Sequence, residues 1–152
     1  IPDAIIHWQN NEILKIRNPL ATRPWQHVLE PISGYLELGL FISENKFKPQ
    51  ELGGNSFNFG PKQIDNLNVE SVVKILSSFW ENSKYEISRE NNFEEAGLLN
   101  LCCDKSTKLL SWESRLRIQE ALLLTSNWYK EQKNNNNMYD FTIKQIEFYL
   151  NK

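Results

Sequence analysis

Glycine is scarce in this sequence, and so are the loops that depend on it. The chain has 6 glycines among 152 residues. None of them is spaced as G-x-G-x-x-G or as G-x-x-x-x-G-K, the two spacings that form phosphate-binding loops for dinucleotides and for nucleoside triphosphates. The sequence therefore encodes neither kind of loop.

Cysteine and histidine are also rare. The two cysteines, Cys102 and Cys103, are adjacent and cannot join distant parts of a fold, which favours a reducing compartment. Neither cysteine has a histidine near it in the sequence, so we predict no catalytic thiol. The two histidines, His7 and His27, have no cysteine or carboxylate at zinc-ligand spacing, and we predict no metal centre.

Long apolar runs and an excess of positive charge are missing as well. No run approaches the roughly 18 apolar residues of a membrane span, and no charged-then-apolar leader opens the chain. The net charge is −2, whereas surfaces for nucleic acids or anionic membranes need a basic excess to replace counterions. We therefore expect a soluble, cytoplasmic protein with no nucleic-acid or membrane partner, in which any phosphate site is local.

Apolar and aromatic residues are abundant, at 40% and 12% of the chain, which predicts one compact domain with a real core. The fold class that we predict is α/β with helix dominating. Long helices are expected near residues 30–43, 68–81 and 117–132, and a tail helix near 139–150. Short helices are expected around 5–8 and from a capping Asp104, and short strands near 13–17, 56–59 and 85–88.

Two details of the predicted helices concern packing and caps. Leu29, Ile32, Leu36 and Leu40 recur at helical spacing in the first long helix. Gly34 and Gly39 weaken that helix by roughly 1 kcal/mol each, so we expect close packing against a neighbour to compensate. Asn68 is predicted to cap the second long helix.

The stretch TRPWQHVLEP places Arg23 just before the first long helix. Such an arginine is usually a solvated surface residue. A guanidinium beside a helix start is also a phosphate ligand, because the helix N–H groups favour an anion. The residues alone leave both interpretations open.

Two further motifs are weak. Tyr129 and Lys133 are spaced as in the Y-x-x-x-K of dehydrogenases. They lie at the end of an amphipathic helix without a Gly-rich loop upstream, so we interpret them as a chance match. Glu94 and Glu95 are adjacent in the chain, which favours two solvated carboxylates over a general acid/base pair.

A wider resemblance runs through NPLATRPWQHVLEPISGYLELG, NSFNFGP and EEAGLLNLCCDKSTKLLSWESRLRIQEALLLTSNWY. These segments resemble the second half of the NAD-dependent nucleotide-sugar epimerases and dehydratases, the extended short-chain dehydrogenase/reductase family. YDFTIKQIEFY resembles the tail of the branch that acts on CDP-glucose. The sequence departs from the family pattern at Cys102 (aspartate expected), Asp104 (serine), Ser111 (glycine) and Glu94 (histidine).

The resemblance implies that this chain is the substrate-binding lobe, which closes over the nucleotide-sugar. The family's Rossmann domain, which carries NAD and the catalytic residues, is absent from this sequence, so the resemblance assigns no catalytic residue here. It places Arg23 on the pyrophosphate and Arg17 near the base and ribose. Trp25 either stacks near the ligand or, as we favour, belongs to the core. For His27 we favour a role in orienting the loop by hydrogen bonds over titration in catalysis. Asn58 either reaches the phosphates or forms a turn.

Three functions remain open. The chain is the nucleotide-sugar lobe of a CDP-glucose-specific lyase, the same lobe of another sugar-nucleotide epimerase or dehydratase, or a non-enzymatic domain that binds a protein partner. The sequence opens on Ile1, directly in an expected helix, so we expect it to be part of a longer protein. Alone, it is expected to be inactive, not to bind NAD, and to self-associate through the face that the Rossmann domain would cover.

Overall fold

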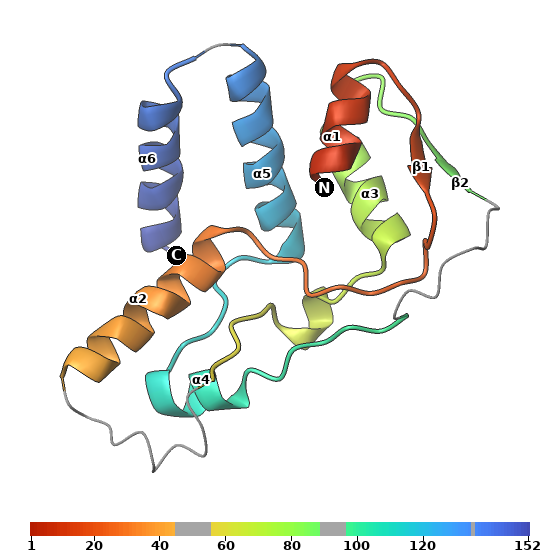
Figure 1. The fold of residues 1–152 in the computed structure, drawn as a ribbon. Helices are drawn as coiled ribbons and strands as arrows, with labels where there is room; N and C mark the ends of the chain where they lie inside the picture. Colours follow the sequence, from red (N-terminus) through yellow and green to blue (C-terminus); the bar gives the residue numbers. More distant parts are fainter. Residues whose placement is uncertain (45–55, 89–96, 135) are drawn as a thin grey trace.

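A computed structural model describes residues 1–44, 56–88, 97–134 and 136–152 of the chain. Helices dominate, with a single pair of short strands in these ranges, and this confirms the predicted mainly helical α/β class (Figure 1). The elements in order are α1 (Pro2–Gln9), β1 (Leu14–Ile16), α2 (Leu29–Ser43), the 3₁₀ turn η2 (Gln63–Asp65), α3 (Val69–Ser77), β2 (Tyr85–Ile87), α4 (Asp104–Leu110), α5 (Ile118–Lys133) and α6 (Met138–Leu150). Over the described ranges no Rossmann-type sheet is present.

The main core lies where α1, α3 and the strands meet the beginning of α5. It is built from buried apolar side chains of all these elements: Ala4, Ile5, Trp8, Leu14, Ile16, Val72, Val73, Leu76, Ile118 and Leu122. Burying such side chains is the dominant favourable contribution to folding. In Figure 1 the elements of this core form the upper half of the molecule, apart from α2 and α4 below.

The two strands form a small parallel sheet in which Leu14 pairs with Tyr85 and Ile16 with Ile87. Both strands were predicted, but their pairing was not. The Nε1–H of Trp8 donates to the main-chain oxygen of Lys84 at 2.8 Å. This bond joins α1 to the start of β2 and stabilises the position of the strand pair.

Helix α3 begins as predicted, since the side chain of Asn68 accepts a hydrogen bond from the main-chain N–H of Ser71 at 2.8 Å. It ends at Ser77, however, before the predicted residue 81. The hydroxyl of Ser83 donates to the main-chain oxygens of Ser77 and Trp80. These carbonyls would accept main-chain N–H groups if the helix continued, so the chain forms a turn here instead. Phe79 and Trp80 still pack against the core from this turn.

The predicted strand at 56–59 is wrong. This segment has no regular secondary structure and joins no sheet, because side chains rather than a neighbouring strand bind its carbonyls. Lys105 Nζ donates to the oxygen of Ser56 at 3.1 Å, the Ser106 hydroxyl donates to that of Asn58, and Gln26 Nε2 donates to that of Phe59 at 2.8 Å.

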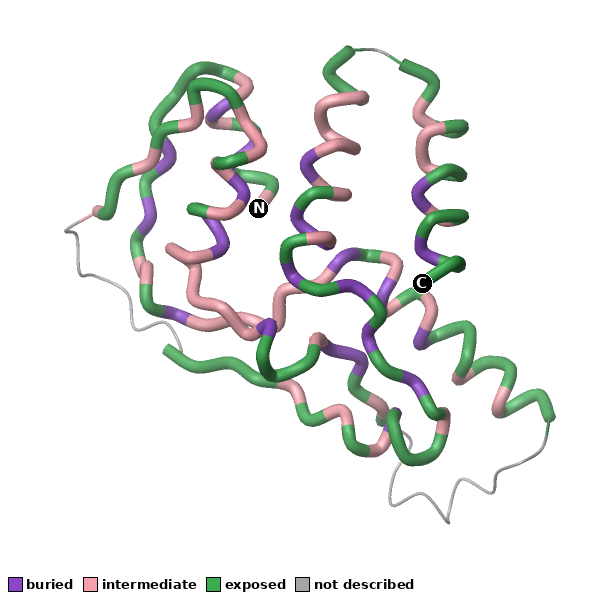
Figure 2. The backbone as a smooth tube through the Cα atoms, turned by 180° about the vertical axis from the view of Figure 1, so that it is seen from behind, coloured by how far each residue is buried: buried purple, intermediate pink, exposed green. Residues whose placement is uncertain are grey.

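Helix α2 extends away from the main core as an arm (Figure 1). Gly34 permits close packing as expected, since a Cβ at this position would lie 2.2 Å from Cδ1 of Phe59. Gly39 has no described neighbour within 4 Å of that position, so the packing expected there is not found in the described part of the chain. Much of the helix surface stays exposed in Figure 2, and its exposed apolar side chains include Ile32, Tyr35, Leu36, Leu40 and Ile42.

Helix α4 differs from the prediction at its start and is unusual at its end. Asp104 is the first helical residue, not the cap; Cys103 occupies the cap position, and no side-chain capping bond is formed. The helix ends at Leu110 and is followed by the cap residue Ser111, whose φ of 53° lies in the left-handed region. Glycine adopts this conformation without strain, so a serine at this position is unusual.

Helices α5 and α6 form an antiparallel hairpin, and their observed bounds confirm the predicted helices. Asn137 caps α6 by accepting hydrogen bonds from the N–H groups of Tyr139 and Asp140. Trp128 Nε1 donates to the hydroxyl of Thr142 at 3.0 Å and ties the two helices together. Among the described residues, no helix has both the length and the apolar character needed to cross a membrane.

Candidate functional site

The segment from Thr22 to His27 crosses between the two halves of the molecule and is held at several points. Thr22 forms isolated bridges to Asn68 and Leu98. Trp25 Nε1 donates to the main-chain oxygen of Leu67 at 3.0 Å. Since the main chain of this segment is fixed, the side chains that it carries are presented in defined directions.

Arg23 from this segment and Arg17 from the end of β1 line one hollow of about 260 Å³, together with Lys15. We call it the cationic hollow. Its wall consists of buried apolar residues of α1, β1 and α3, namely Ala4, Leu14, Ile16, Val72, Val73 and Leu76. Asp3 and Asn18 complete its polar lining. An apolar wall with a few convergent charged groups is typical of small-molecule sites.

The cations of the hollow have different surroundings. Arg23 is half-buried, and its Nη1 donates to the main-chain oxygen of Thr22 at 2.8 Å, which orients the guanidinium. Arg17 is exposed. Lys15 Nζ lies 3.8 Å from Oε1 of Glu86 in an exposed ion pair across the strands. Exposed pairs of this kind contribute little stability.

Trp25 contributes to both the hollow and the core. Trp25 lines the hollow, as Arg23 does, and its side chain packs against the main core cluster. Trp25 therefore lies where the core meets the hollow, a position compatible with both a core residue and a residue near the ligand.

His27 lies outside the described lining of the cationic hollow. It is buried and lines a separate, mostly apolar hollow of about 380 Å³ between the start of α2 and helices α5 and α6. Burial lowers the pKa of its imidazole, which keeps the ring neutral near pH 7. Its Nδ1 accepts the N–H of Leu29 at 3.3 Å, at the first residue of α2.

Asn58 also lies apart from the arginines. Its Nδ2 donates to the main-chain oxygen of Cys102 at 3.2 Å, and its own main-chain oxygen accepts from Ser106. The structure therefore brings Arg17, Arg23 and Trp25 together and leaves His27 and Asn58 at other places.

The residues of the weaker motifs fall elsewhere. Tyr129 packs against the main core, and Lys133 is exposed at the end of α5. Cys102 is exposed and Cys103 is half-buried; burial raises the pKa of the Cys103 thiol and disfavours a thiolate there. Glu94 and Glu95 lie outside the described residues.

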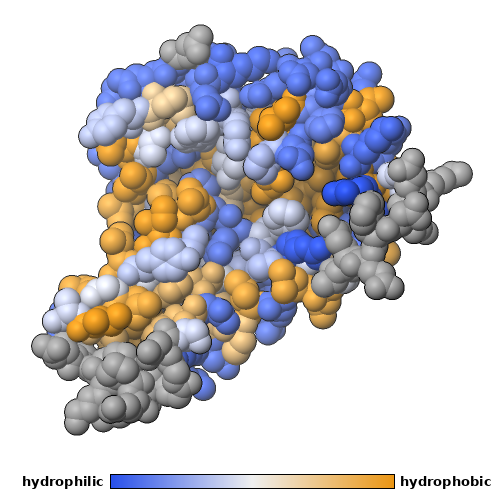
Figure 3. Space-filling view, viewed as in Figure 1, coloured by the Kyte–Doolittle hydropathy of each residue, from blue (hydrophilic) through white to orange (hydrophobic). Residues whose placement is uncertain are grey.

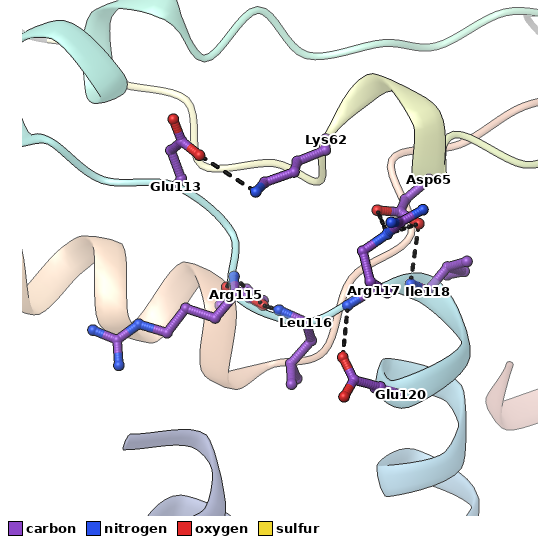
Figure 4. A network of polar contacts seen from close by, with 9 residues as sticks. Lys62, Asp65, Glu113, Arg115, Leu116, Arg117, Ile118 and Glu120 are labelled. Atoms are coloured by element: carbon purple, nitrogen blue, oxygen red, sulfur yellow. Dashed lines mark hydrogen bonds and ion pairs between the residues drawn. The ribbon is translucent and has the colours of Figure 1, made fainter. Parts of the chain in front are cut away.

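Sequence reasoning missed two buried carboxylates. Glu30 accepts hydrogen bonds from the main-chain N–H groups of Arg115 and Leu116, the latter at 2.7 Å, and from the Tyr149 hydroxyl at 2.9 Å. Asp65 accepts from Arg117 Nε at 2.9 Å and from the N–H of Ile118 at 3.2 Å (Figure 4). We call these two carboxylates and the segment 112–118 the carboxylate junction.

The junction was hard to foresee. An acidic residue in the first turn of a helix is ordinary, because it complements the helix dipole, and Glu30 occupies such a position in α2. Its partners are 85 and 86 residues away in the chain. The segment SWESRLR before α5 could have indicated the junction. Its main-chain N–H groups need hydrogen-bond acceptors when the segment is buried, and acidic side chains are candidate acceptors.

Comparison with known proteins places these observations in context. No known family profile matches the chain. The chain is 33% identical over 153 aligned residues to CDP-glucose 4,6-dehydratase of Salmonella typhimurium, an alignment that covers 99% of this chain and 41% of that enzyme. The chain therefore spans about two fifths of the length of this relative. This similarity confirms the resemblance inferred from the sequence motifs.

Proposed function

We propose, from that similarity, that the chain is the nucleotide-sugar-binding lobe of an NAD-dependent CDP-glucose 4,6-dehydratase. The reaction would comprise oxidation, loss of water and return of hydride on the hexose of CDP-glucose. NAD and the catalytic residues would belong to a Rossmann domain that packs beside this lobe, since this sequence has no dinucleotide loop. The part played by this chain is to bind and orient the substrate.

The observation that carries the proposal is the convergence of Arg17, Arg23 and Lys15 on one hollow. A diphosphate carries negative charge that paired guanidinium N–H groups recognise in a planar, bidentate manner. Arg23 is oriented by its bond to Thr22 and is half-buried, where a charge interaction is screened less than at a fully exposed site. We assign the pyrophosphate to Arg23 and the neighbourhood of the ribose and base to Arg17.

The apolar wall supplies the second element of nucleotide recognition. Leu14, Ile16 and Val73 are buried side chains that line the hollow between its charged groups. A flat base gains free energy when it covers exposed apolar surface, which the half-buried Val69 offers in this hollow. Trp25 adds an aromatic surface next to the arginine.

Two alternatives change the ligand or the class of protein. The same lobe would serve another sugar-nucleotide epimerase or dehydratase, because the chemistry is decided outside this chain. A non-enzymatic interaction domain is favoured by the exposed apolar residues of α2, such as Tyr35 at 64% and Leu36 at 70% exposure. Figure 3 shows hydrophobic surface over this arm. Such a surface also favours self-association of the isolated chain.

A titration with CDP tests the proposal. Amide shifts of the isotopically labelled chain should change around residues 14–18 and 22–25, with a Kd near about 1 mM, or about −4 kcal/mol, because only part of the enzyme's contacts is present. Arg23→Ala should weaken binding about tenfold or more, since it removes a charged hydrogen bond. Lys144→Ala, which removes an exposed cation on α6, is the matched control and should leave binding unchanged.

Two results would contradict the proposal. One is a set of shifts that cluster away from the cationic hollow. The other is binding that survives Arg23→Ala in a variant whose circular dichroism shows a native fold. In parallel, the chain alone should not bind NAD or convert CDP-glucose, and saturable turnover by a clean preparation would show that catalysis does not require the proposed second domain.

A further inference from the structure

The hollow that His27 lines, between the start of α2 and helices α5 and α6, is called the apolar hollow below. Its volume is about 380 Å³, within the range of roughly 300 to 1,000 Å³ that is typical of small-molecule pockets. Its described lining contains no acidic or basic side chain apart from the imidazole of His27. An ion would lose its hydration there without gaining an opposite charge. The apolar hollow therefore suits an uncharged ligand.

The fold itself uses several of the polar side chains in this lining. Trp128 Nε1 donates to the hydroxyl of Thr142 at 3.0 Å, and the hydroxyl of Thr125 donates to the main-chain oxygen of Ala121 at 2.8 Å. Gln145 Nε2 donates to a main-chain oxygen of α5 at 2.8 Å. Because these donors already have acceptors within the protein, a ligand gains little by offering them another.

His27 differs from these residues. It is 6% exposed, and its Nδ1 accepts the N–H of Leu29 at 3.3 Å. Burial lowers the pKa of the ring and keeps it neutral near pH 7, and a neutral imidazole whose Nδ1 accepts has its proton on Nε2. In the described part of the chain no acceptor binds this Nε2–H. A nearly buried donor without a partner is unfavourable, so a ligand gains by supplying an acceptor to it.

The Nε2 atom of His27 is also accessible. It is not one of the fully enclosed side-chain atoms that lack a partner, so the small exposed part of the residue includes this nitrogen. Since His27 lines the apolar hollow, a molecule in that hollow can reach the donor.

Aromatic and aliphatic side chains form the rest of the surface. The rings of Trp128 and Tyr129 lie with their centroids 5.4 Å apart and their planes at 83°, and both residues line the hollow together with Val28 and Leu29. An apolar group that covers such surface gains free energy, and a flat one can also stack against a ring or meet its edge.

We propose that the apolar hollow is a second ligand site, which binds an uncharged and largely apolar small molecule through a carbonyl-type oxygen that accepts from His27 Nε2–H. The described linings of this site and of the cationic hollow share Ile1 alone. The inference goes beyond the proposed function, because a diphosphate requires cationic donors, and the described lining of the apolar hollow offers none.

Two probes of the same shape test the proposal: acetophenone, and 2-phenylpropene, in which a CH₂ group replaces the carbonyl oxygen. Amide shifts of the labelled chain should change saturably with both probes in residues 26–29, 125–129 and 142–145. The nitrogen signal of His27 Nε2 should move with acetophenone and stay nearly fixed with 2-phenylpropene, a readout that needs no variant. Saturating CDP should leave the binding of both probes unchanged.

Variants of His27 isolate the hydrogen bond, because the ratio of the two affinities cancels effects common to both probes. His27→Asn keeps an acceptor near the Nδ1 position and loses the Nε2 donor, so the affinity for acetophenone relative to 2-phenylpropene should fall about fivefold. His27→Gln keeps a donor near the Nε2 position and should retain most of the original ratio. His7→Asn makes the same change outside the described lining of the hollow and should leave the ratio as it is.

The outcomes are separate from those of the proposed function. The inference is overturned if no saturable shifts appear at these residues, if the His27 Nε2 signal moves equally with both probes, or if a folded His27→Asn keeps the original ratio. If His27→Asn does not fold, the nitrogen signal of the original chain decides. Displacement of the probes by CDP would assign the apolar hollow to the nucleotide site and also overturn the inference, whereas CDP binding at Arg23 without any effect on the probes leaves both proposals standing.

Discussion

The carboxylate junction and the cationic hollow are both groups of charged residues, but the protein surrounds them differently. At the junction Glu30 and Asp65 are each 1% exposed, and main-chain N–H groups and neighbouring side chains bind their oxygens. In the hollow the cations lie at the surface of an open cavity with an apolar wall. The carboxylates of the junction are enclosed by the fold, whereas the residues of the hollow line a cavity that is open to solvent.

The burial of a charged group distinguishes a structural residue from a candidate binding residue more reliably than the residue type does. A buried carboxylate is costly unless it is fully hydrogen-bonded, so its partners must be part of the fold. Glu30 and Asp65 therefore fix the segment before α5 against α2 and η2. Figure 4 shows Asp65 beside this segment. Substitutions at the junction should reduce stability, and substitutions in the hollow should change ligand binding.

The largest effect is expected for Glu30→Ala. The change leaves the N–H groups of Arg115 and Leu116 and the hydroxyl of Tyr149 without their acceptor. Each buried group left unpaired costs about 1 to 3 kcal/mol, so the free energy of unfolding should fall by about 4 kcal/mol in urea titrations. Asp3→Asn, in the hollow, should change it by less than about 0.5 kcal/mol. Equal losses in the two variants would remove the distinction between the regions.

The next effect concerns the packing of α2 beside the junction. Gly34→Ala would place a methyl group 2.2 Å from Cδ1 of Phe59, and such overpacking costs about 1 to 3 kcal/mol. Gly39→Ala has no described atom within 4 Å and should stabilise the helix by up to about 1 kcal/mol. Thermal unfolding should move the two midpoints in opposite directions; a tolerated Gly34→Ala would show that Phe59 is not packed as described.

A smaller effect is expected from alkaline pH at the junction. Burial, reinforced by the Glu30 carboxylate and opposed by the hydroxyl of Ser33, raises the pKa of Tyr149 to about 12. The unfolded chain loses this proton near its ordinary pKa of about 10, so stability is complete below that pH and falls as pH rises toward 12. The loss should be on the order of 2 kcal/mol. Urea unfolding at several alkaline pH values should show this decline and show it weakened in Tyr149→Phe; identical slopes would refute the assignment.

The smallest effect is expected for an exposed ion pair near the junction. Lys62 Nζ lies 3.4 Å from Oε2 of Glu113, with both side chains at least half exposed (Figure 4). Pairs of this kind contribute about 0 to 1 kcal/mol. Lys62→Ala should therefore change the free energy of unfolding by about 0.5 kcal/mol or less. A loss as large as that of Glu30→Ala would mean that surface charge, rather than the buried carboxylates, holds this segment.

The sequence predicted the helices well because their signals are local. The cap at Asn68 and the apolar spacing in α3, α5 and α6 depend on neighbouring residues. The strand at 56–59 failed for the opposite reason: its pattern is that of a strand, but Ser106 and Gln26, which bind its carbonyls, are distant in the chain. The parallel pairing of β1 with β2 is equally a long-range property.

The candidate site was predicted in part. The position of Arg23 before α2 is visible in the sequence, and the resemblance added Arg17, Trp25, His27 and Asn58. Arg17, Arg23 and Trp25 share a hollow because of how α1, β1 and α3 pack. His27 and Asn58 lie elsewhere.

Hydrogen exchange of the whole chain with and without saturating CDP tests the central distinction most directly. The account predicts slower exchange in residues 14–18 and 22–25, which border the cationic hollow, and unchanged exchange in residues 112–118 of the carboxylate junction. Protection by CDP at the junction, with none around Arg23, would contradict it.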